Sequence, residues 1–347
     1  MIAAQKLISP EATPIQIGAA RLSGRAFLAP MAGVTDFAMR RIAERHGASA
    51  TVSEMIAGAG VQRGDRETAH RLRASGASGA APRVVQIAAR DVEGIAAAAR
   101  CAEAAGADWV DINMGCPCKR VTGGLAGAAL MRDLDQAVRL IAAARAAVAI
   151  PVTVKMRLGW DDASRNAPEL ARRAEAEGVA LLTVHGRTRQ QFYKGRADWA
   201  AIAAVTSAVR IPVVANGDCA SPEGARDMLR ASGADAVMIG RAAQGRPWLV
   251  GDIAHALATG SNRPAPDMPT RGALAREHLD GLLTLMGAEA GLRHARKHLA
   301  AYVDHAVADG LAACAEWRRE LVTTPDHHAA FRLIDQIFTS PVTEAAA

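Results

Sequence analysis

The residues with the clearest chemical potential lie in one short segment, Asp111-Ile112-Asn113-Met114-Gly115-Cys116-Pro117. A hydrophobic strand predicted from Asp108 to Ile112 leads directly into a Gly-Cys-Pro turn. One carboxamide and one thiol therefore stand at the carboxyl end of a buried strand, where parallel α/β folds build their active sites. A cysteine in this place is a catalytic acid or nucleophile, a metal ligand, or an inert core residue.

Composition limits these choices. The five cysteines are scattered through the sequence, and the amino-terminal residues lack the continuous apolar core of a secretion signal. A disulfide framework is therefore not expected. Cys116-Pro117-Cys118 has no second cysteine pair to complete a zinc or iron–sulfur site, and we predict no metal. No run approaches the roughly 18 apolar residues of a membrane span, so we expect no membrane partner and a cytoplasmic location.

The net charge is +6, and it is unevenly distributed. Residues 261–347 hold nine Lys/Arg and eleven Asp/Glu, or −2, which leaves 32 basic and 24 acidic residues, or +8, in residues 1–260. Such an excess is compatible with a polyanionic partner but does not require one.

Eight short apolar runs alternate with longer Ala-rich stretches that have helical periodicity. The predicted strands are Ala26–Ala29, Ala50–Ser53, Val84–Ala88, Trp109–Ile112, Val152–Met156, Leu181–Val184, Val213–Ala215 and Ala236–Ile239. The helices between them are Phe37–His46, Val92–Ala105, Leu134–Ala147, Ser164–Glu177, Trp199–Val209 and Pro222–Ala231. Eight β/α units predict a (β/α)₈ TIM barrel of the α/β class, with a doubly wound open sheet as the alternative.

A Pro/Gly/Ser/Asn-rich linker at Thr259–Pro269 separates this barrel from the carboxyl-terminal segment. Helical patterns over Thr270–Gly287, Gly291–Val307 and Ala329–Phe338 predict a small all-α domain there. We therefore divide the chain into a catalytic barrel, residues 1–258, and a helical domain, residues 259–347.

Polar residues follow or end most of the predicted strands, and a parallel barrel brings such residues to one face. Taken singly, each is more typical of a structural residue than of a catalytic one. Gly217 and Gly240 follow the last two strands, where barrels often bind phosphate through backbone N–H groups, and Arg241 adds a cation. Lys155 and His185 lie further round the same mouth, as expected for partners of an anionic flavin.

Together these residues resemble the tRNA-dihydrouridine synthases, most closely the bacterial B-type branch. The matching stretches are APMAGVTD at Ala29–Asp36, DINMGCP at Asp111–Pro117, PVTVKMRLGW at Pro151–Trp160, HGRTR at His185–Arg189, ANGD at Ala215–Asp218, IGRAAQGRPW at Ile239–Trp248 and ARKH at Ala295–His298. The similarity extends from about Ala26 to Phe338.

The resemblance implies an FMN-dependent oxidoreductase that takes electrons from NADPH and reduces the C5=C6 bond of a tRNA uridine, position 17 of the D-loop for the B-type branch. It implies an FMN site formed by Pro30, Met31, Gln86, Asn113, Lys155, His185, Asn216, Gly217, Asp218, Gly240 and Arg241. Cys116 is implied as the general acid that protonates C5, opposite the hydride donor.

For the tRNA we predict contacts from Arg187 and from the tail residues Arg293, Arg296, Lys297 and His298. On a helix, Arg293, Arg296 and Lys297 share one face, which is equally typical of a solvated surface. No obligate protein partner is predicted.

Two positions depart from the family pattern. Ala89 replaces a usual glycine, and we expect its methyl group to tighten the cofactor pocket; Cys118 replaces a common alanine near the predicted acid. Two other functions remain open: an FMN reductase of a small pyrimidine or dihydroorotate-type substrate, and a tRNA-binding chaperone whose catalysis is dispensable. The predicted tail argues against the first, and the complete set Asn113, Cys116, Lys155 and His185 against the second.

Overall fold

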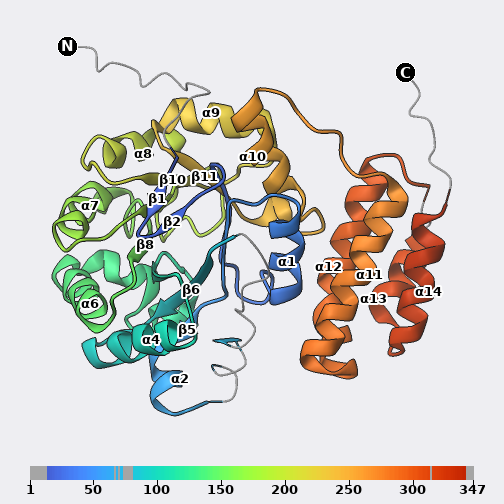
Figure 1. The fold of residues 1–347 in the computed structure, drawn as a ribbon, viewed down its shortest axis with the longest axis horizontal. Coiled ribbons are helices and arrows are strands. Elements are labelled where there is room, and N and C mark those ends of the chain that lie inside the picture. Colours follow the sequence, from blue (N-terminus) through green and yellow to red (C-terminus); the bar gives the residue numbers. More distant parts are fainter. Residues whose placement is uncertain (1–13, 66–67, 69–70, 73–80, 313–314, 341–347) are drawn as a thin grey trace.

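A closed barrel of eight parallel strands forms the larger part of the computed structural model, which describes residues 14–65, 68, 71–72, 81–312 and 315–340 (Figure 1). The strands are β3 (Ala26–Leu28), β4 (Ala50–Val52), β6 (Arg83–Ala88), β7 (Trp109–Met114), β8 (Val152–Arg157), β9 (Leu182–His185), β10 (Val213–Asn216) and β11 (Ala236–Ile239). Each pairs in parallel with its neighbours, and β4 also pairs with β6. That pairing closes the sheet, so the predicted TIM barrel is confirmed and the open sheet is excluded.

The strands are apolar on both faces because both faces are covered. Val85, Ile87 and Val154 point outward into the core shared with the helices, whereas Phe27, Val84 and Trp109 belong to a second cluster. A short antiparallel hairpin, β1 (Gln16–Ile17) and β2 (Ala20–Arg21), contributes Ile15, Ile17 and Leu22 to that second cluster. Since the cluster includes residues at the starts of β7 and β11, the hairpin covers the amino end of the barrel and leaves the carboxyl end for the site.

Helices surround the barrel (Figure 1). Their bounds are α1 (Phe37–Arg45), α2 (Gly58–Gln62), α4 (Val92–Ala104), α5 (Lys119–Thr122), α6 (Leu134–Ala147), α7 (Ala167–Ala176), α8 (Trp199–Thr206), α9 (Pro222–Ser232) and α10 (Leu249–Thr259). Asp36, Asp91 and Ser221 each accept a hydrogen bond from a backbone N–H in the first turn of the helix that follows. Helix α7 begins three residues later than predicted, because Asp161 and Ser164 form a capping box around a 3₁₀ turn.

The carboxyl-terminal helices pack together at one side of the barrel, at the right of Figure 1. They are α11 (Met268–Met286), α12 (Ala288–Ala308), α13 (Ala315–Thr323) and α14 (His327–Phe338), of which α13 was not predicted. Their apolar core includes Ile42 of α1 and Trp248, so the helices and the barrel share buried surface. Among the described residues, no helix is both long and apolar enough to cross a membrane.

Candidate active site at the carboxyl end of the barrel

A cavity of about 870 Å³ opens at the carboxyl ends of the strands. Every residue predicted to bind the cofactor lines it, together with the predicted acid: Pro30, Met31, Gln86, Asn113, Cys116, Lys155, His185, Asn216, Gly217, Asp218, Gly240 and Arg241. The structure thus brings together residues that are up to 211 positions apart in the sequence. Ala89 is not among the lining residues; it is buried in the core between barrel and helices, so the expectation that its methyl group narrows the pocket is wrong.

Asn113 shapes the turn that carries the thiol. Its Oδ1 accepts hydrogen bonds from the backbone N–H groups of Gly115, at 3.1 Å, and Cys116, at 2.9 Å. Its Nδ2 donates to Gln86 Oε1 at 2.8 Å. The carboxamide is 9% exposed and is thereby fixed between the strand and the turn.

A chain of buried polar groups supports Asn113 from below. Gln86 Nε2 donates to Asp111 Oδ2, and Thr153 Oγ1 donates to Asp111 Oδ1, each at 2.7 Å. Burial raises the pKa of the Asp111 carboxyl, although its two hydrogen bonds and Lys155 oppose the shift. Asp111 and Thr153 are the members of this chain that the sequence did not assign to the site; for Asp111 the available signal was its place two residues before Asn113, which puts both side chains on the same face of the strand.

Cys116 is half-buried at the cavity wall, whereas Cys118, which also lines the cavity, is exposed. Burial raises the pKa of the Cys116 thiol above its usual value, against the opposing effects of Arg157 and Lys155. The thiol therefore carries its proton at neutral pH, which suits a proton donor better than a nucleophile or a metal ligand. Both cysteines are free.

Two cations flank the thiol from β8. Lys155 Nζ donates to Asn216 Oδ1 at 3.0 Å, and burial, with the nearby Arg157, lowers its pKa to about 8. Arg157 is 1% exposed and donates from Nε to the Gly115 carbonyl at 2.8 Å, and from Nη1 to the carbonyls of Thr188 and Phe192. Arg157 thus ties the cysteine turn to the loop that follows β9. It follows Lys155 by two residues on β8, which places both side chains on the same face of that strand.

His185 lies against Gly217 on the far side of the cavity. Burial lowers the pKa of His185 well below its usual value, and Lys155, Arg157, Arg187 and Arg241 act in the same direction, so the ring is neutral. Gly217 has φ of +121°, and a β-carbon there would lie 2.7 Å from Ala197 Cβ and 3.1 Å from the His185 ring. The glycine is therefore required both by its backbone conformation and by space.

Asp218 connects the two arginines at this side. Its carboxylate accepts hydrogen bonds from Arg187 Nη1 at 3.1 Å and Nη2 at 2.5 Å, and from Arg241 Nη2 at 3.2 Å. The Arg187 side chain is 1% exposed and also donates to the carbonyls of Lys194 and Gly195. Arg187 therefore holds the loop after β9, and its predicted contact with tRNA stays a prediction.

The tail residues predicted to contact tRNA lie in different environments. Lys297 is exposed, and so is Arg293, which lies 3.4 Å from Glu289. Arg296 is partly buried and donates to the carbonyls of Thr323 and Thr324 at the end of α13. His298 is 1% exposed, and its predicted contact with tRNA stays a prediction.

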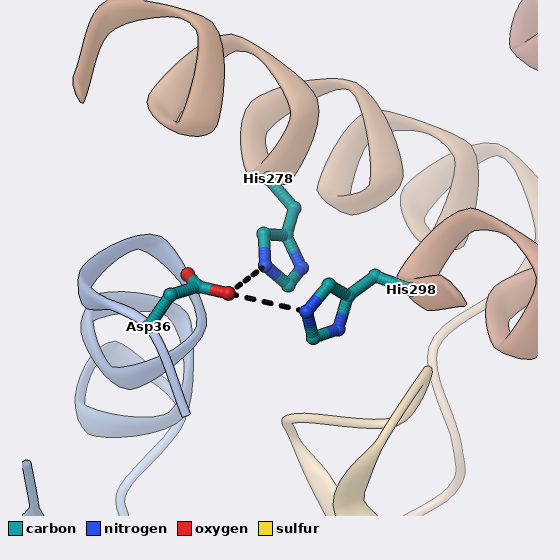
Figure 2. A group of neighbouring side chains, drawn as sticks. All are labelled: Asp36, His278 and His298. Carbon is teal, nitrogen blue, oxygen red and sulfur yellow. Dashed lines mark hydrogen bonds and ion pairs between the residues drawn. The ribbon is translucent and has the colours of Figure 1, made fainter. Parts of the chain in front are cut away.

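His298 instead belongs to a buried cluster between the barrel and the helices (Figure 2). Asp36 Oδ1 caps α1 through Met39 N at 3.0 Å, and Oδ2 lies 3.2 Å from both His278 Nε2 and His298 Nε2. The His278 contact has hydrogen-bond geometry; His298 Nε2 lies off the line that a hydrogen bond requires. Burial lowers the pKa of His298 to about 4, and the two histidines hold the pKa of Asp36 well below its usual range.

The ligand atoms of Asp36, His278 and His298 lie within 4.8 Å of one another, close enough to hold a metal ion. However, Arg40 and Lys297 already act electrostatically on the Asp36 carboxylate. A divalent cation would have to share that carboxylate with two positive side chains, so the surroundings favour a polar link between barrel and helices. The prediction that the chain has no metal site stays a prediction.

The chain matches the family model described as dihydrouridine synthase over residues 27–342. The chain belongs to the dihydrouridine synthase family. A relative from Rhodobacter capsulatus, described as a probable tRNA-dihydrouridine synthase, is 46% identical over 94% of this chain and 98% of its own length. Another from Rhizobium leguminosarum bv. phaseoli, with the same description, is 50% identical over 81% and 85%. A tRNA-dihydrouridine synthase B from Xanthomonas campestris pv. campestris is 47% identical over 84% and 87%.

Among solved structures, a 2-naphthoyl-CoA reductase complex is similar with a TM-score of 0.57 at 13% identity, covering 73% of this chain and 53% of that one. A histamine dehydrogenase from Rhizobium is similar with a TM-score of 0.55 at 15% identity, over 84% and 51%. At such low identity these likenesses support the barrel fold of the family and nothing beyond it.

Proposed function

We propose that this protein is a tRNA-dihydrouridine synthase that uses FMN and NADPH to reduce the C5=C6 bond of a D-loop uridine, at position 17. The observation that carries the proposal is the joint placement of Asn113, Cys116, Lys155 and His185 around one cavity in a member of this family. A protonated thiol beside a set of cations and a glycine cradle is the arrangement that reduction of a conjugated ring needs.

The cavity suits a flavin mononucleotide in size and in chemistry. Its volume falls within the roughly 300–1,000 Å³ typical of ligand pockets. The absence of a β-carbon at Gly217 leaves backbone accessible beside a neutral His185, and Arg241 supplies a cation near the same turn. Lys155 is buried, with Asn216 as its neighbour, and can bind the anionic edge of a flavin ring. Bound FMN would supply the hydride for C6 and NADPH the electrons that renew it.

The protein's own contribution to the chemistry is the proton for C5. Hydride addition to a uracil ring builds enolate charge, and an acid on the opposite face relieves it. Cys116 fits this role because burial keeps its thiol protonated and because Asn113 fixes the backbone N–H of the same residue. Asn113 is itself placed by Gln86 and Asp111, so the acid is held by a continuous set of hydrogen bonds.

Recognition of tRNA is assigned to both parts of the chain, with residues 1–258 as the catalytic barrel and 259–347 as the tRNA-binding helices. Arg293 and Lys297 are exposed on α12, and the Lys297 Nζ lies close to Gly33 of the segment that borders the cavity. Arg296 contributes by fixing α12 to α13. We expect the cytoplasm as the site of action and no obligate protein partner.

The test uses purified protein, unmodified tRNA and NADPH, with dihydrouridine measured by mass spectrometry of tRNA digests. We expect a yellow protein that releases FMN on denaturation and forms dihydrouridine at position 17. Free uracil and dihydroorotate serve as parallel substrates. Turnover of either one with no change in tRNA would refute the proposal in favour of a small-molecule reductase.

A further inference from the structure

Leu125 is unusual in two respects, the exposure of its side chain and the conformation of its backbone. Its side chain is 67% exposed, more than any other large apolar side chain in the part of the chain that the structure describes. Its φ is +57°, in the left-handed region that a leucine rarely occupies. Backbone strain of this kind persists where the surrounding structure imposes it, and it gathers at functional sites.

The position of this strain is informative because two glycines stand beside it. Gly123 and Gly124 directly precede Leu125, yet neither has a positive φ. The turn that ends α5 is closed by a hydrogen bond from Leu125 N to the Thr122 carbonyl at 3.1 Å. At a helix end the residue in the left-handed conformation is normally a glycine. Here it is Leu125, a residue with an exposed apolar side chain.

The strained turn is joined to the catalytic cysteine. Two residues after Leu125, a β-carbon on Gly127 would lie 3.0 Å from the Cys116 carbonyl oxygen and 3.3 Å from Cys116 Cβ. The next residue, Ala128, donates its backbone N–H to the Cys116 carbonyl at 3.1 Å. Leu125 therefore belongs to the same segment as the acid, two and three residues before the positions that contact Cys116.

The segments next to the Leu125 turn are positive and aromatic. Arg189 Nη2 lies 3.4 Å from Thr122 Oγ1, and its guanidinium stacks between the rings of Trp160, at 4.7 Å, and Phe192, at 4.6 Å. Residues 115–132 hold three basic and no acidic residues, and residues 186–196 hold no acidic residue and, besides the buried Arg187 that pairs with Asp218, three basic ones. An exposed apolar side chain among unbalanced cations fits an unstacked nucleotide better than an apolar protein surface.

We propose that Leu125 is a wedge that packs against the nucleotide next to the target uridine when that uridine enters the cavity. This inference rests on the proposed function. Moving a base out of a folded RNA removes its stacking, and proteins compensate by inserting apolar side chains beside the vacated place. The strained backbone of Leu125 holds the side chain outward before the tRNA arrives, so no ordering is needed on binding.

The test compares Leu125→Ser with Leu125→Met, which keeps an apolar side chain of similar size, and with Val92→Ser, a matched loss of an exposed apolar side chain on α4. Steady-state formation of dihydrouridine gives KM for tRNA and kcat, and bleaching at 450 nm gives the rate of flavin reduction by NADPH. We expect Leu125→Ser to raise KM for tRNA roughly five- to tenfold. Leu125→Met and Val92→Ser stay within about twofold of the parent protein, and flavin reduction is unchanged in all three.

A second readout reports stacking directly. 2-Aminopurine placed beside the target uridine changes its fluorescence on binding the parent protein, and Leu125→Ser reduces that change. If Leu125→Ser leaves both KM and fluorescence as they were, the wedge is refuted while the proposed function stands. If it slows flavin reduction as much as tRNA turnover, Leu125 supports the loop instead and the inference is equally refuted. Absence of dihydrouridine with the parent protein would refute the proposed function itself.

Discussion

Replacement of Asp36 by alanine tests whether this residue links the barrel to the carboxyl-terminal helices in addition to capping α1. Asp36 is 4% exposed and serves two purposes: Oδ1 caps α1, and Oδ2 faces His278 and His298 (Figure 2). Loss of a cap costs about 1 kcal/mol. A buried imidazole N–H left without its acceptor costs a further ~1–3 kcal/mol, and the second histidine loses its charged neighbour. We therefore expect Asp36→Ala to lower the free energy of unfolding by roughly 3–4 kcal/mol.

Asp91→Ala is the matched control, because Asp91 also caps a barrel helix, accepting from Gly94 N at 2.7 Å, but has Arg90 at 3.5 Å as its ionic neighbour. We expect this variant to lose about 1 kcal/mol. Urea unfolding followed by circular dichroism at pH 7 measures both values. Equal losses in the two variants would contradict the link, since the histidines would then contribute nothing beyond the cap.

Three further predictions follow from the site and its surroundings. Burial lowers the pKa of His298 to about 4, whereas the unfolded chain titrates near 6.5, so the unfolded state binds more protons between these values. The contribution of His298 to the free energy of unfolding is therefore fully present above pH 6.5 and falls by at most roughly 3 kcal/mol as the pH drops to 4. Urea unfolding should show a smaller difference in stability between pH 7 and pH 5 for His298→Gln than for the parent protein. Lys155 has a pKa of about 8 in the free protein and loses its charge above that pH, so FMN affinity measured by fluorescence titration should weaken from pH 7 to 9. Lys155→Arg should remove this pH dependence. The same change of affinity with pH in Lys155→Arg would contradict the role of Lys155. Gly217→Ala should lose FMN, because the added β-carbon meets Ala197 and His185. The control Gly260→Ala, at a position with φ of +78° and no neighbour within 4 Å of the added β-carbon, should lose about 1 kcal/mol of stability and keep FMN. Equal flavin content in the two variants would argue against a cofactor cradle at Gly217.

The barrel could be predicted because buried parallel strands read as continuous apolar runs, and because glycines mark the helix ends. Gly47, Gly106, Gly178 and Gly233 follow four of the predicted helices in the sequence, and all have the positive φ typical of a helix end. Strands of two residues, such as those of the β1–β2 hairpin, are too short for a periodic signal, and α13 has only nine residues with few apolar side chains, which gives a weak helical pattern.

The cavity could be predicted for a geometric reason, since the carboxyl ends of parallel strands meet at one face and polar residues at those ends must converge. The burial of Arg187 and His298 could not be predicted, for an equally physical reason. Each lies against a carboxylate that is distant in the sequence, Asp218 for Arg187 and Asp36 for His298. The partner of His298, Asp36, lies 262 positions away in the sequence, and no local pattern connects them.

The central claim is that Cys116 donates the proton that completes reduction of a tRNA uridine. The most direct measurement is dihydrouridine formed on unmodified tRNA by Cys116→Ala and, as the matched control, Cys118→Ala, with flavin reduction by NADPH followed in the same preparations. We predict that Cys116→Ala lowers product formation by about 10²-fold or more and leaves flavin reduction intact, because only the proton transfer is lost. Cys118→Ala should retain activity, since Cys118 is exposed and Asn113 fixes the backbone N–H of Cys116 and not that of Cys118. Undiminished dihydrouridine from Cys116→Ala would contradict the account.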